Sequence, residues 1–223
     1  MNRSAVLLSG GLDSAVLVAM ERASGFEVWP VHVRAGLAWE DGEAAAIRRL
    51  LAEPSFRAGV QPLTTLAVDM TDVYPASHWA FSGQPPAYDS PDEAVFLAGR
   101  NIVLTAKTAV FARQRGIARI ALGPLAGNPF PDATPEFFDA MADALSRGLA
   151  STIHIATPLA TMHKTDVIRR GAELGVPLDL TMSCLRPTAD RHCGACNKCR
   201  ERREAFAAAN VLDRTAYETT GLR

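Results

Sequence analysis

A short turn with three oxygen-bearing side chains interrupts the apolar N-terminal part of the chain, where the sequence reads SGGLDS. Gly10 and Gly11 allow the backbone to approach a ligand closely, and free N–H groups at the start of a helix favour an anion. Ser9, Asp13 and Ser14 add side-chain oxygens to the same turn. The pattern predicts a phosphate-binding loop, although a plain strand-to-helix turn with Ser or Asp as its N-cap has the same appearance.

The stretches on either side of this turn favour the phosphate-binding interpretation. Residues 5–8 are aliphatic and predict a buried parallel strand, and the apolar residues 15–20 predict a largely buried helix. Two common phosphate-binding patterns, GxxxxGK[ST] and GxGxxG, do not occur in the sequence. What remains is SGGxDS between a predicted strand and a predicted helix, a context that favours phosphate binding over a plain turn.

The four cysteines of the chain are gathered near its C-terminus. Cys184 precedes the segment CGACNKC, which contributes Cys193, Cys196 and Cys199. Four thiolates on tight turns suit tetrahedral zinc, and such a site is structural because four protein ligands close the coordination shell. An iron–sulfur cluster, a redox pair and four unrelated buried thiols are the alternatives. We expect His192 to be a neighbour on the surface rather than a ligand.

The composition is that of an ordinary globular protein. Of the 223 residues, 48% are hydrophobic and 21% are charged, and the net charge of −1 gives no overall basic field for nucleic acid. No run of about 18 apolar residues is present for a membrane span, and the first apolar run is interrupted too early for a signal peptide. We therefore expect a cytoplasmic protein without disulfides, membrane contact or a stable nucleic-acid partner.

Apolar runs alternate with amphipathic stretches, which predicts an α/β fold with a doubly wound parallel sheet of about five strands. The expected strands are residues 5–8, 28–33, 63–68, 117–123 and 153–156. The expected helices beyond the first are residues 43–52, 101–115, 135–149 and 164–174. Residues 74–92 are rich in proline and predict either a lid or a poorly ordered insertion. Ligands bind at the carboxyl ends of parallel strands, where the SGGLDS turn also lies.

Three motifs in order resemble one known family. They are SGGxDS near the N-terminus, GRN at positions 99–101, and C-x8-C-G-x-C-x2-C-x-x-R near the C-terminus. Over nearly the whole chain this resembles the 7-cyano-7-deazaguanine synthases, which are N-type ATP pyrophosphatases. The resemblance implies a Rossmann-like ATP pyrophosphatase domain at residues 1–180, with a helical zinc-binding segment at residues 181–223 packed on it. It also implies an ATP-dependent ligase that uses ammonia to convert 7-carboxy-7-deazaguanine to the nitrile, a queuosine precursor, and it suggests a homodimer.

The resemblance also implies roles for individual residues. The residues expected to hold the pyrophosphate are Ser9, Gly10, Gly11, Leu12, Asp13 and Ser14, with Asp13 near the phosphates or Mg²⁺. Arg100 is the expected charge clamp, because a guanidinium binds phosphate or carboxylate as a fork, and Lys164 is expected near the phosphates. Asn101 and Gly123 are expected to complete the nucleotide site. Asp13, Ser14, Arg100 and Lys164 form the predicted catalytic set. The alternatives are a surface arginine at a helix start and a solvated lysine.

Two loops depart from the family pattern where the substrate should bind. Residues 33–40 read VRAGLAWE where the family has DYGQ[RK]H, and they keep only its glycine. Residues 124–134 read PLAGNPFPDAT; they keep Gly127, Pro131 and Asp132 but lack the family's cysteine and arginine. The activation residues are therefore predicted to be intact and the substrate pocket to be altered.

Several functions stay open at this point. If Arg34, Trp39 and residues 124–134 reshape the pocket, 7-carboxy-7-deazaguanine should be a poor substrate, unless backbone groups recognise the purine edge. A paralogue would then adenylate another carboxylate or attach a deazaguanine to another acceptor. A tRNA thiolase should have a basic face and a cysteine outside the zinc site. A non-catalytic nucleotide-binding module has no need of a complete SGGxDS loop.

Overall fold

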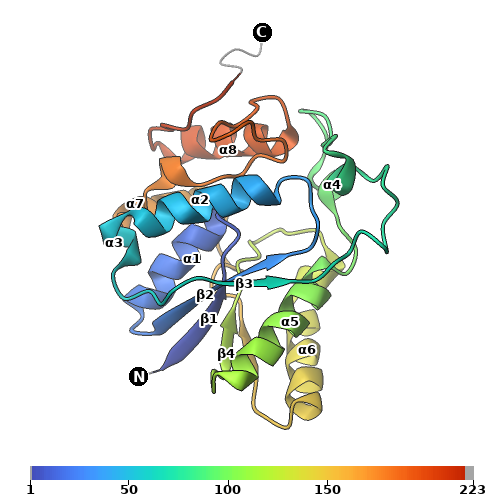
Figure 1. The fold of residues 1–223 in the computed structure, drawn as a ribbon. Coiled ribbons are helices and arrows are strands. Elements are labelled where there is room, and N and C mark those ends of the chain that lie inside the picture. Colours follow the sequence, from blue (N-terminus) through green and yellow to red (C-terminus); the bar gives the residue numbers. More distant parts are fainter. Residues whose placement is uncertain (1, 219–223) are drawn as a thin grey trace.

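Five short strands form a single parallel sheet in the computed structural model, which describes residues 2–218 (Figure 1). The strands are β1 (Arg3–Leu7), β2 (Glu27–Arg34), β3 (Thr64–Ala67), β4 (Arg119–Ala121) and β5 (His154–Ala156). Their order is β3-β2-β1-β4-β5, and every neighbouring pair is parallel. The chain order reverses beside β1, so the carboxyl end of β1 is where such a sheet binds ligands. The predicted doubly wound α/β fold is confirmed.

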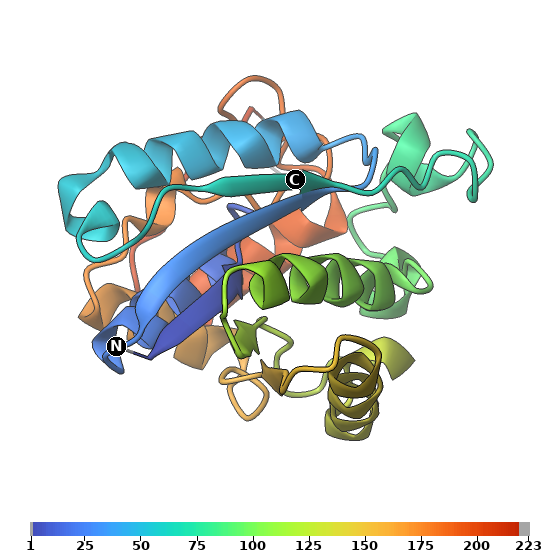
Figure 2. The same ribbon diagram turned by 60° about the horizontal axis from the view of Figure 1, so that its bottom comes forward.

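Helices cover both faces of the sheet (Figures 1 and 2). The first face carries α1 (Leu12–Ala23), α2 (Glu40–Ala52), α7 (Lys164–Glu173) and α8 (Asn197–Ala209). The second face carries α5 (Arg100–Gln114) and α6 (Pro135–Gly148). Because side chains alternate along a strand, β1 supplies Val6 to the first core and Ala5 to the second.

The predicted elements agree with the structure to within a few residues, apart from short pieces. Strand β4 is shorter than the predicted 117–123, and α2 begins at Glu40 instead of residue 43. The sequence did not predict the short elements α3 (Pro54–Arg57), α4 (Trp79–Ser82), η1 (Asp92–Val95), η2 (Pro131–Ala133) and η3 (Leu178–Leu180). Within residues 2–218, no helix combines the length and the apolar character that crossing a membrane requires.

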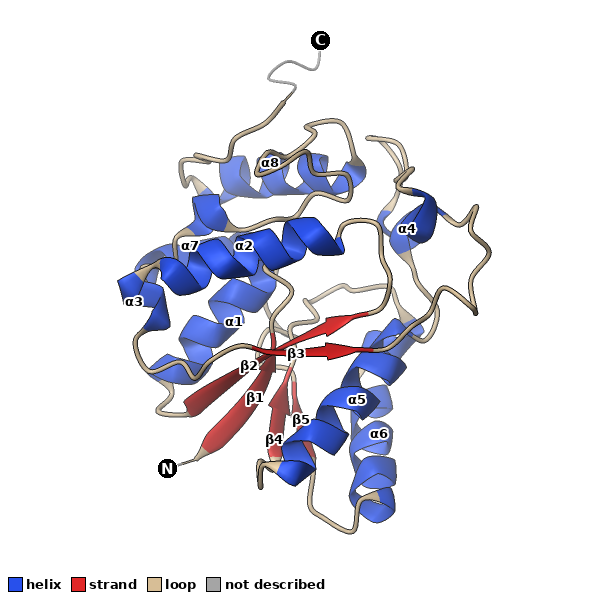
Figure 3. Ribbon diagram, in the orientation of Figure 1, coloured by secondary structure: helices blue, strands red, loops and turns tan. Residues whose placement is uncertain are grey.

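Residues 74–92 form a packed excursion beside the carboxyl ends of β2 and β3, seen around α4 in Figure 3. The Trp79 ring stacks on Trp39 at 5.4 Å with an interplanar angle of 7°. The Tyr74 hydroxyl donates a hydrogen bond to the Ala98 carbonyl. These contacts join the excursion to the small hydrophobic cluster around Leu37 at the start of α2. The excursion therefore forms one wall of the region above the sheet.

The C-terminal segment packs on the first face of the sheet through α8. Ala205 and Phe206 belong to the same hydrophobic cluster as the residues of α1. Arg202, which is buried, donates hydrogen bonds to the Leu178 carbonyl at 2.7 Å and to the Thr181 hydroxyl at 2.9 Å. Packing and buried hydrogen bonds thus hold α8 close to the start of α1. The division into residues 1–180 and 181–223 stays a prediction.

Candidate active site and metal centre

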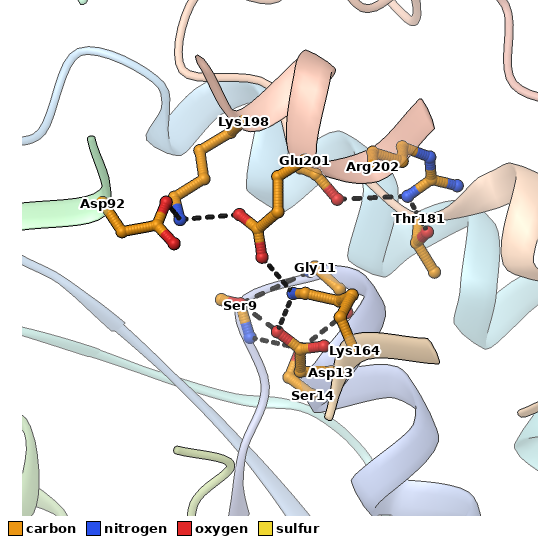
Figure 4. A network of polar contacts seen from close by, with 11 residues as sticks. Ser9, Gly11, Asp13, Ser14, Asp92, Lys164, Thr181, Lys198, Glu201 and Arg202 are labelled. Atoms are coloured by element: carbon orange, nitrogen blue, oxygen red, sulfur yellow. Dashed lines mark hydrogen bonds and ion pairs between the residues drawn. The ribbon is translucent and has the colours of Figure 1, made fainter. Parts of the chain in front are cut away.

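The SGGLDS loop is shaped by its own backbone. Gly10 has φ +76°, and a Cβ atom there would lie 2.8 Å from the carbonyl oxygen of Glu43 in α2. Only glycine fits this position without strain. The Ser14 hydroxyl donates to the Gly11 carbonyl at 2.9 Å, and the Ser9 N–H donates to Ser14 Oγ at 3.3 Å. These bonds close the loop around the start of α1 (Figure 4).

The N-terminus of α1 keeps its N–H groups available for an anion. Its N-cap is Gly11, and no side chain in the described part of the chain caps the helix. By contrast, α6 is capped by the Thr134 hydroxyl, which accepts from the Phe137 N–H at 3.1 Å. A helix start without a side-chain cap leaves orphan donors, and the positive end of the helix dipole lies at the same place. This geometry fits the predicted phosphate-binding loop.

Lys164 connects the loop to the C-terminal helix. Its ammonium lies 2.6 Å from Asp13 Oδ2 and 3.2 Å from Glu201 Oε1 (Figure 4). Burial alone would lower the pKa of Lys164, but the two carboxylates outweigh it and raise the pKa above its ordinary value. For Glu201 burial acts in the opposite direction and would raise the pKa, but the nearby charges of Lys164 and Lys198 outweigh it and lower the pKa to about 2. The site therefore holds a fixed row of alternating charges at neutral pH.

Two cavities lie beside the loop. The larger, of about 280 Å³, lies at the carboxyl ends of β1, β2 and β4, and the smaller, of about 190 Å³, lies toward the cysteine segment. Both are lined by Ser9, Asp13, Glu43 and Arg100, which we call the junction. The other predicted site residues at the larger cavity are Ser14, Asn101 and Gly123, and those at the smaller are Gly11, Leu12 and Lys164. Gly10 lines neither cavity and shapes the loop instead.

Arg100 and Asn101 begin α5 and face the larger cavity. Asn101 holds the loop before α6, because its N–H donates to Asp132 Oδ2 at 3.1 Å and its side-chain amide donates to the Asp132 carbonyl at 2.9 Å. The Nε of Arg100 is buried and finds no hydrogen-bond partner among the described residues. Arg100 is thus a cavity residue and not a surface arginine at a helix start.

Glu43 is a junction residue that the sequence did not single out. Its carboxyl accepts a hydrogen bond from Trp39 Nε1 at 3.1 Å and is buried. Burial raises the pKa of Glu43 to about 7; Arg100 and the Trp39 hydrogen bond act against the rise, and Glu40 adds to it. A glutamate in the first turn of a helix is ordinary in sequence, so no signal marked it.

The four cysteines come together as predicted. Their Sγ atoms are buried and lie within 4.8 Å of one another, with Cys193 and Cys199 at 3.9 Å and Cys196 and Cys199 at 3.5 Å. Tetrahedral zinc, with Zn–S bonds of about 2.3 Å, needs S···S distances of about 3.8 Å. The Cys193 N–H donates to the Cys184 sulfur at 3.3 Å, and the Ala195 N–H donates to the Cys193 sulfur at 3.4 Å. The cluster therefore fits a metal ion held by four thiolates.

The chain is similar to known proteins over nearly its whole length. A family model described as "Queuosine biosynthesis protein QueC" matches residues 3–210. The chain belongs to the QueC family. A 7-cyano-7-deazaguanine synthase of Azoarcus sp. is 34% identical, with 97% of each chain covered. Another, of Methanothrix thermoacetophila, is 32% identical and covers 98% of this chain and 100% of its own length.

A solved structure shows the same fold at low sequence identity. NMN synthetase from Francisella tularensis superposes with a TM-score of 0.52 at 13% identity, covering 95% of this chain and 78% of its own. At this identity the likeness concerns the fold alone. It agrees with the doubly wound sheet described above.

The expected surface position of His192 is wrong. The side chain is buried, and its Nε2 accepts a hydrogen bond from the Ser183 N–H at 3.0 Å. Its ring lies 5.5 Å from that of Tyr217, and it is not part of the four-cysteine group. His192 sits in the interior because the strand-like pairing with Tyr217 folds the chain back over it. It therefore supports the segment beside the metal centre.

Both loops that depart from the QueC family pattern reach the cavities. Residues 33–40 contribute Leu37 to the larger cavity and Trp39 to the smaller. Residues 124–134 contribute Phe130, whose ring stacks on Phe96 at 5.2 Å. Arg34, expected at the pocket, lines neither cavity and forms ion pairs with two acidic side chains of α2.

Proposed function

We propose that this chain converts 7-carboxy-7-deazaguanine and ammonia to 7-cyano-7-deazaguanine, using ATP to activate the acid. Membership of the QueC family supports the proposal, because relatives that match nearly the full chain carry the name of this synthase. The observation that carries it is the junction, where the SGGLDS loop and Arg100 lie between two cavities. A reaction that joins a nucleotide to a second substrate needs two such cavities with a phosphate-binding loop between them.

The chemistry of activation suits the residues present. A carboxylate is a poor electrophile until one of its oxygens becomes a good leaving group, and transfer of AMP from ATP supplies that group. The N–H groups at the start of α1 would bind the pyrophosphate, and Arg100 would stabilise the charge that develops at the α-phosphate. Lys164 would hold Asp13 in place. The buried Oδ1 of Asp13 has no hydrogen-bond partner among the described residues and is the atom that would bind Mg²⁺.

Each activation is followed by departure of AMP. Ammonia attacks the first adenylate and gives the amide. The amide oxygen is then adenylated in a second activation, and loss of AMP leaves the nitrile. The two cavities on either side of the loop would hold the adenosine of ATP and the deazapurine ring. Fixed geometry at the junction would bring the acid's carboxyl group to the α-phosphate.

The four-cysteine centre fits zinc by its distances and its all-thiolate donor set, and we propose zinc there with Cys184, Cys193, Cys196 and Cys199 as ligands. With four protein ligands the ion would have no open position for catalysis. It would supply folding energy to residues 181–223, the proposed second unit beside residues 1–180. We also propose a homodimer that works in the cytoplasm with ammonia as the nitrogen source.

The two loops whose sequences differ from the family pattern, residues 33–40 and 124–134, support a second candidate function. Leu37 and Phe130 both line the larger cavity, so the substitutions lie where a substrate would be recognised. A site built to hydrogen-bond a ring loses about 1–3 kcal/mol for each unmatched buried group. A paralogue with this pocket would adenylate a different carboxylate, or attach a deazaguanine to another acceptor, with the same activation residues.

A screen for acid-dependent release of AMP and pyrophosphate tests both candidates. The protein is incubated with ATP, Mg²⁺, ammonium and one acid at a time, beginning with 7-carboxy-7-deazaguanine. Release that needs this acid supports the synthase. Release with another acid alone supports the paralogue, and ATP binding without any release would indicate a non-catalytic nucleotide-binding module.

A further inference from the structure

We propose that Glu43 is the general base of the reaction, which takes protons from the nitrogen, first from ammonium before its lone pair attacks and then as the carbon–nitrogen bond forms. The proposal deepens the proposed function and rests on it. Among the predicted site residues none was assigned this task. The geometry that points to Glu43 is its position at the junction, with its carboxyl group next to the phosphate-binding loop and Arg100.

The junction is where the reacting atoms must meet. The loop binds the phosphates, so the α-phosphate and the acyl carbon attached to it lie where the two cavities join. Within residues 2–218, only two carboxylates, Asp13 and Glu43, line both cavities. Asp13 is held by the Lys164 ammonium at 2.6 Å, whereas no ion pair joins Glu43 to any of the described residues. Glu43 is thus the carboxylate at the junction that is free to receive a proton.

The Glu43 carboxyl group is held rigidly. Trp39 Nε1 donates to Oε1 at 3.1 Å, and the Trp39 ring is itself fixed by stacking on Trp79. The first turn of α2 lies against the loop, because the Glu43 carbonyl approaches Gly10 too closely for any other residue. These contacts occupy Oε1 and leave Oε2 without a hydrogen bond in the described part of the chain. A fixed carboxyl with one open oxygen is the geometry that a general base requires.

The charges and the burial around Glu43 suit a general base. Charged or titratable groups around the two cavities come from each neighbouring element. They are Asp13 (α1), His32 (β2), Glu40 (α2), Arg100 (α5), Asp132 (η2), Lys164 (α7), and Lys198, Glu201 and Arg202 (α8). Burial, the dominant effect, sets the pKa of Glu43 at about 7. A base is most effective when its pKa lies near the working pH. At neutral pH a large fraction of Glu43 is therefore ionised and still basic enough to accept a proton.

The nitrogen must lose protons both when the amide forms and when the nitrile forms, so a base at the junction is needed in both halves of the reaction. Ammonium must lose one proton before its lone pair can attack, and the nitrogen loses a second as the carbon–nitrogen bond forms and the carbon–oxygen bond to AMP breaks. After the second activation, the nitrogen loses its last two protons as the second AMP leaves and the nitrile forms. Glu43 accepts a proton from nitrogen and returns it to solvent between these steps.

The test compares Glu43→Gln with the unmodified enzyme. The amide oxygen of glutamine still accepts from Trp39 Nε1, so the fold is kept. With 7-carboxy-7-deazaguanine, ATP and saturating ammonium, we expect nitrile formation to fall by about 100- to 1,000-fold. Pyrophosphate release in the first turnover should stay within a few-fold, because activation of the acid needs no base. The rise of kcat through pH 7 should also disappear. The matched control is Asp41→Asn, the same change on an exposed side chain two residues away, and it should leave every rate unchanged.

Hydroxylamine separates a base from a merely structural residue. Unlike ammonium it is mostly unprotonated at neutral pH and needs no base before it attacks. Product formation with hydroxylamine, as the hydroxamate, should therefore fall much less in Glu43→Gln than nitrile formation does. Nitrile formation by Glu43→Gln at the unmodified rate and pH profile would overturn the proposal. An equal loss of pyrophosphate release, or an equal loss of product formation with hydroxylamine, would also overturn it. If the unmodified enzyme releases no AMP with this acid, the proposed function fails instead, and the same comparison is made with the acid that the screen identifies.

Discussion

The N-terminal loop lines both cavities and the C-terminal cysteine segment lines the smaller one, and different physical forces hold the two in place. The loop consists of six consecutive residues, and its backbone bonds and Gly10 fix its shape locally. The cysteine segment has its ligands spread over positions 184–199 and depends on packing and on the proposed metal. Yet its helix α8 supplies Glu201, which lies 3.2 Å from Lys164. The C-terminal segment thus contributes to the charge network at the candidate site.

The largest effect is expected from the loop. Asp13→Ala and Ser14→Ala should each lower AMP formation by at least about 100- to 1,000-fold, because they remove groups that hold and shape the phosphate site. The fold should persist, since both changes are at a ligand-facing turn. Pyrophosphate release measures the loss. The matched control Ser24→Ala lies exposed just beyond the end of α1 and should have no effect. Normal pyrophosphate release by both Asp13→Ala and Ser14→Ala would show that the loop does not bind the phosphates.

Changes at the cysteine cluster should lower the stability of the protein before they lower its activity. We expect purified protein to hold about one zinc ion per chain. Cys196→Ser, or removal of the metal with a chelator, should lower the free energy of unfolding by several kcal/mol, because a structural site contributes folding energy. Metal analysis and thermal unfolding measure the two quantities. Iron with sulfide, or protein without metal and with unchanged stability, would contradict the zinc assignment.

A smaller effect should show that the tail acts on the loop. Glu201→Gln removes one of the two carboxylates that hold Lys164, so the lysine is placed less precisely toward the phosphates. We expect the KM for ATP to rise about tenfold with little change in kcat, the pattern of lost ground-state binding. Steady-state kinetics measure it, and Glu204→Gln on the exposed side of the same helix is the control. Equal KM values for the two variants would show that α8 is only a scaffold.

The last test distinguishes two carboxylates by the pH dependence of stability. Glu43 has a pKa of about 7, above its ordinary 4.5, so the folded protein keeps a proton that the unfolded chain loses and stability falls as the pH rises from 4.5 to 7. Glu201 has a pKa of about 2, so its stabilisation is present above pH 4.5 and is lost as the pH falls toward 2. Glu43→Gln should remove the change in unfolding free energy between pH 4.5 and 7, and Glu201→Gln should remove the change between pH 2 and 4.5. Denaturant unfolding at each pH measures both. If Glu43→Gln instead changed the lower pH range and Glu201→Gln the higher one, the environments described for these two carboxylates would be contradicted.

The sequence predicted what depends on local pattern. SGGLDS, the spacing of the cysteines and the five apolar runs identified the loop, the metal centre and the sheet, because each is encoded by neighbouring residues. Glu43 and Glu201 escaped notice, because a glutamate near the start of a helix is ordinary and only tertiary packing brings these two to the cavities. His192 was placed on the surface because its burial depends on pairing with Tyr217, 25 positions further along the chain.

The central claim is that the junction activates an acid with ATP so that ammonia can replace its oxygen atoms. The most direct measurement mixes the protein with ATP, Mg²⁺, ammonium and 7-carboxy-7-deazaguanine, and follows the acid, the amide, the nitrile and AMP by mass spectrometry. We expect transient amide, then nitrile, with two AMP formed for each nitrile as the two activations require. Absence of both amide and nitrile, with no AMP that depends on the acid, would contradict it.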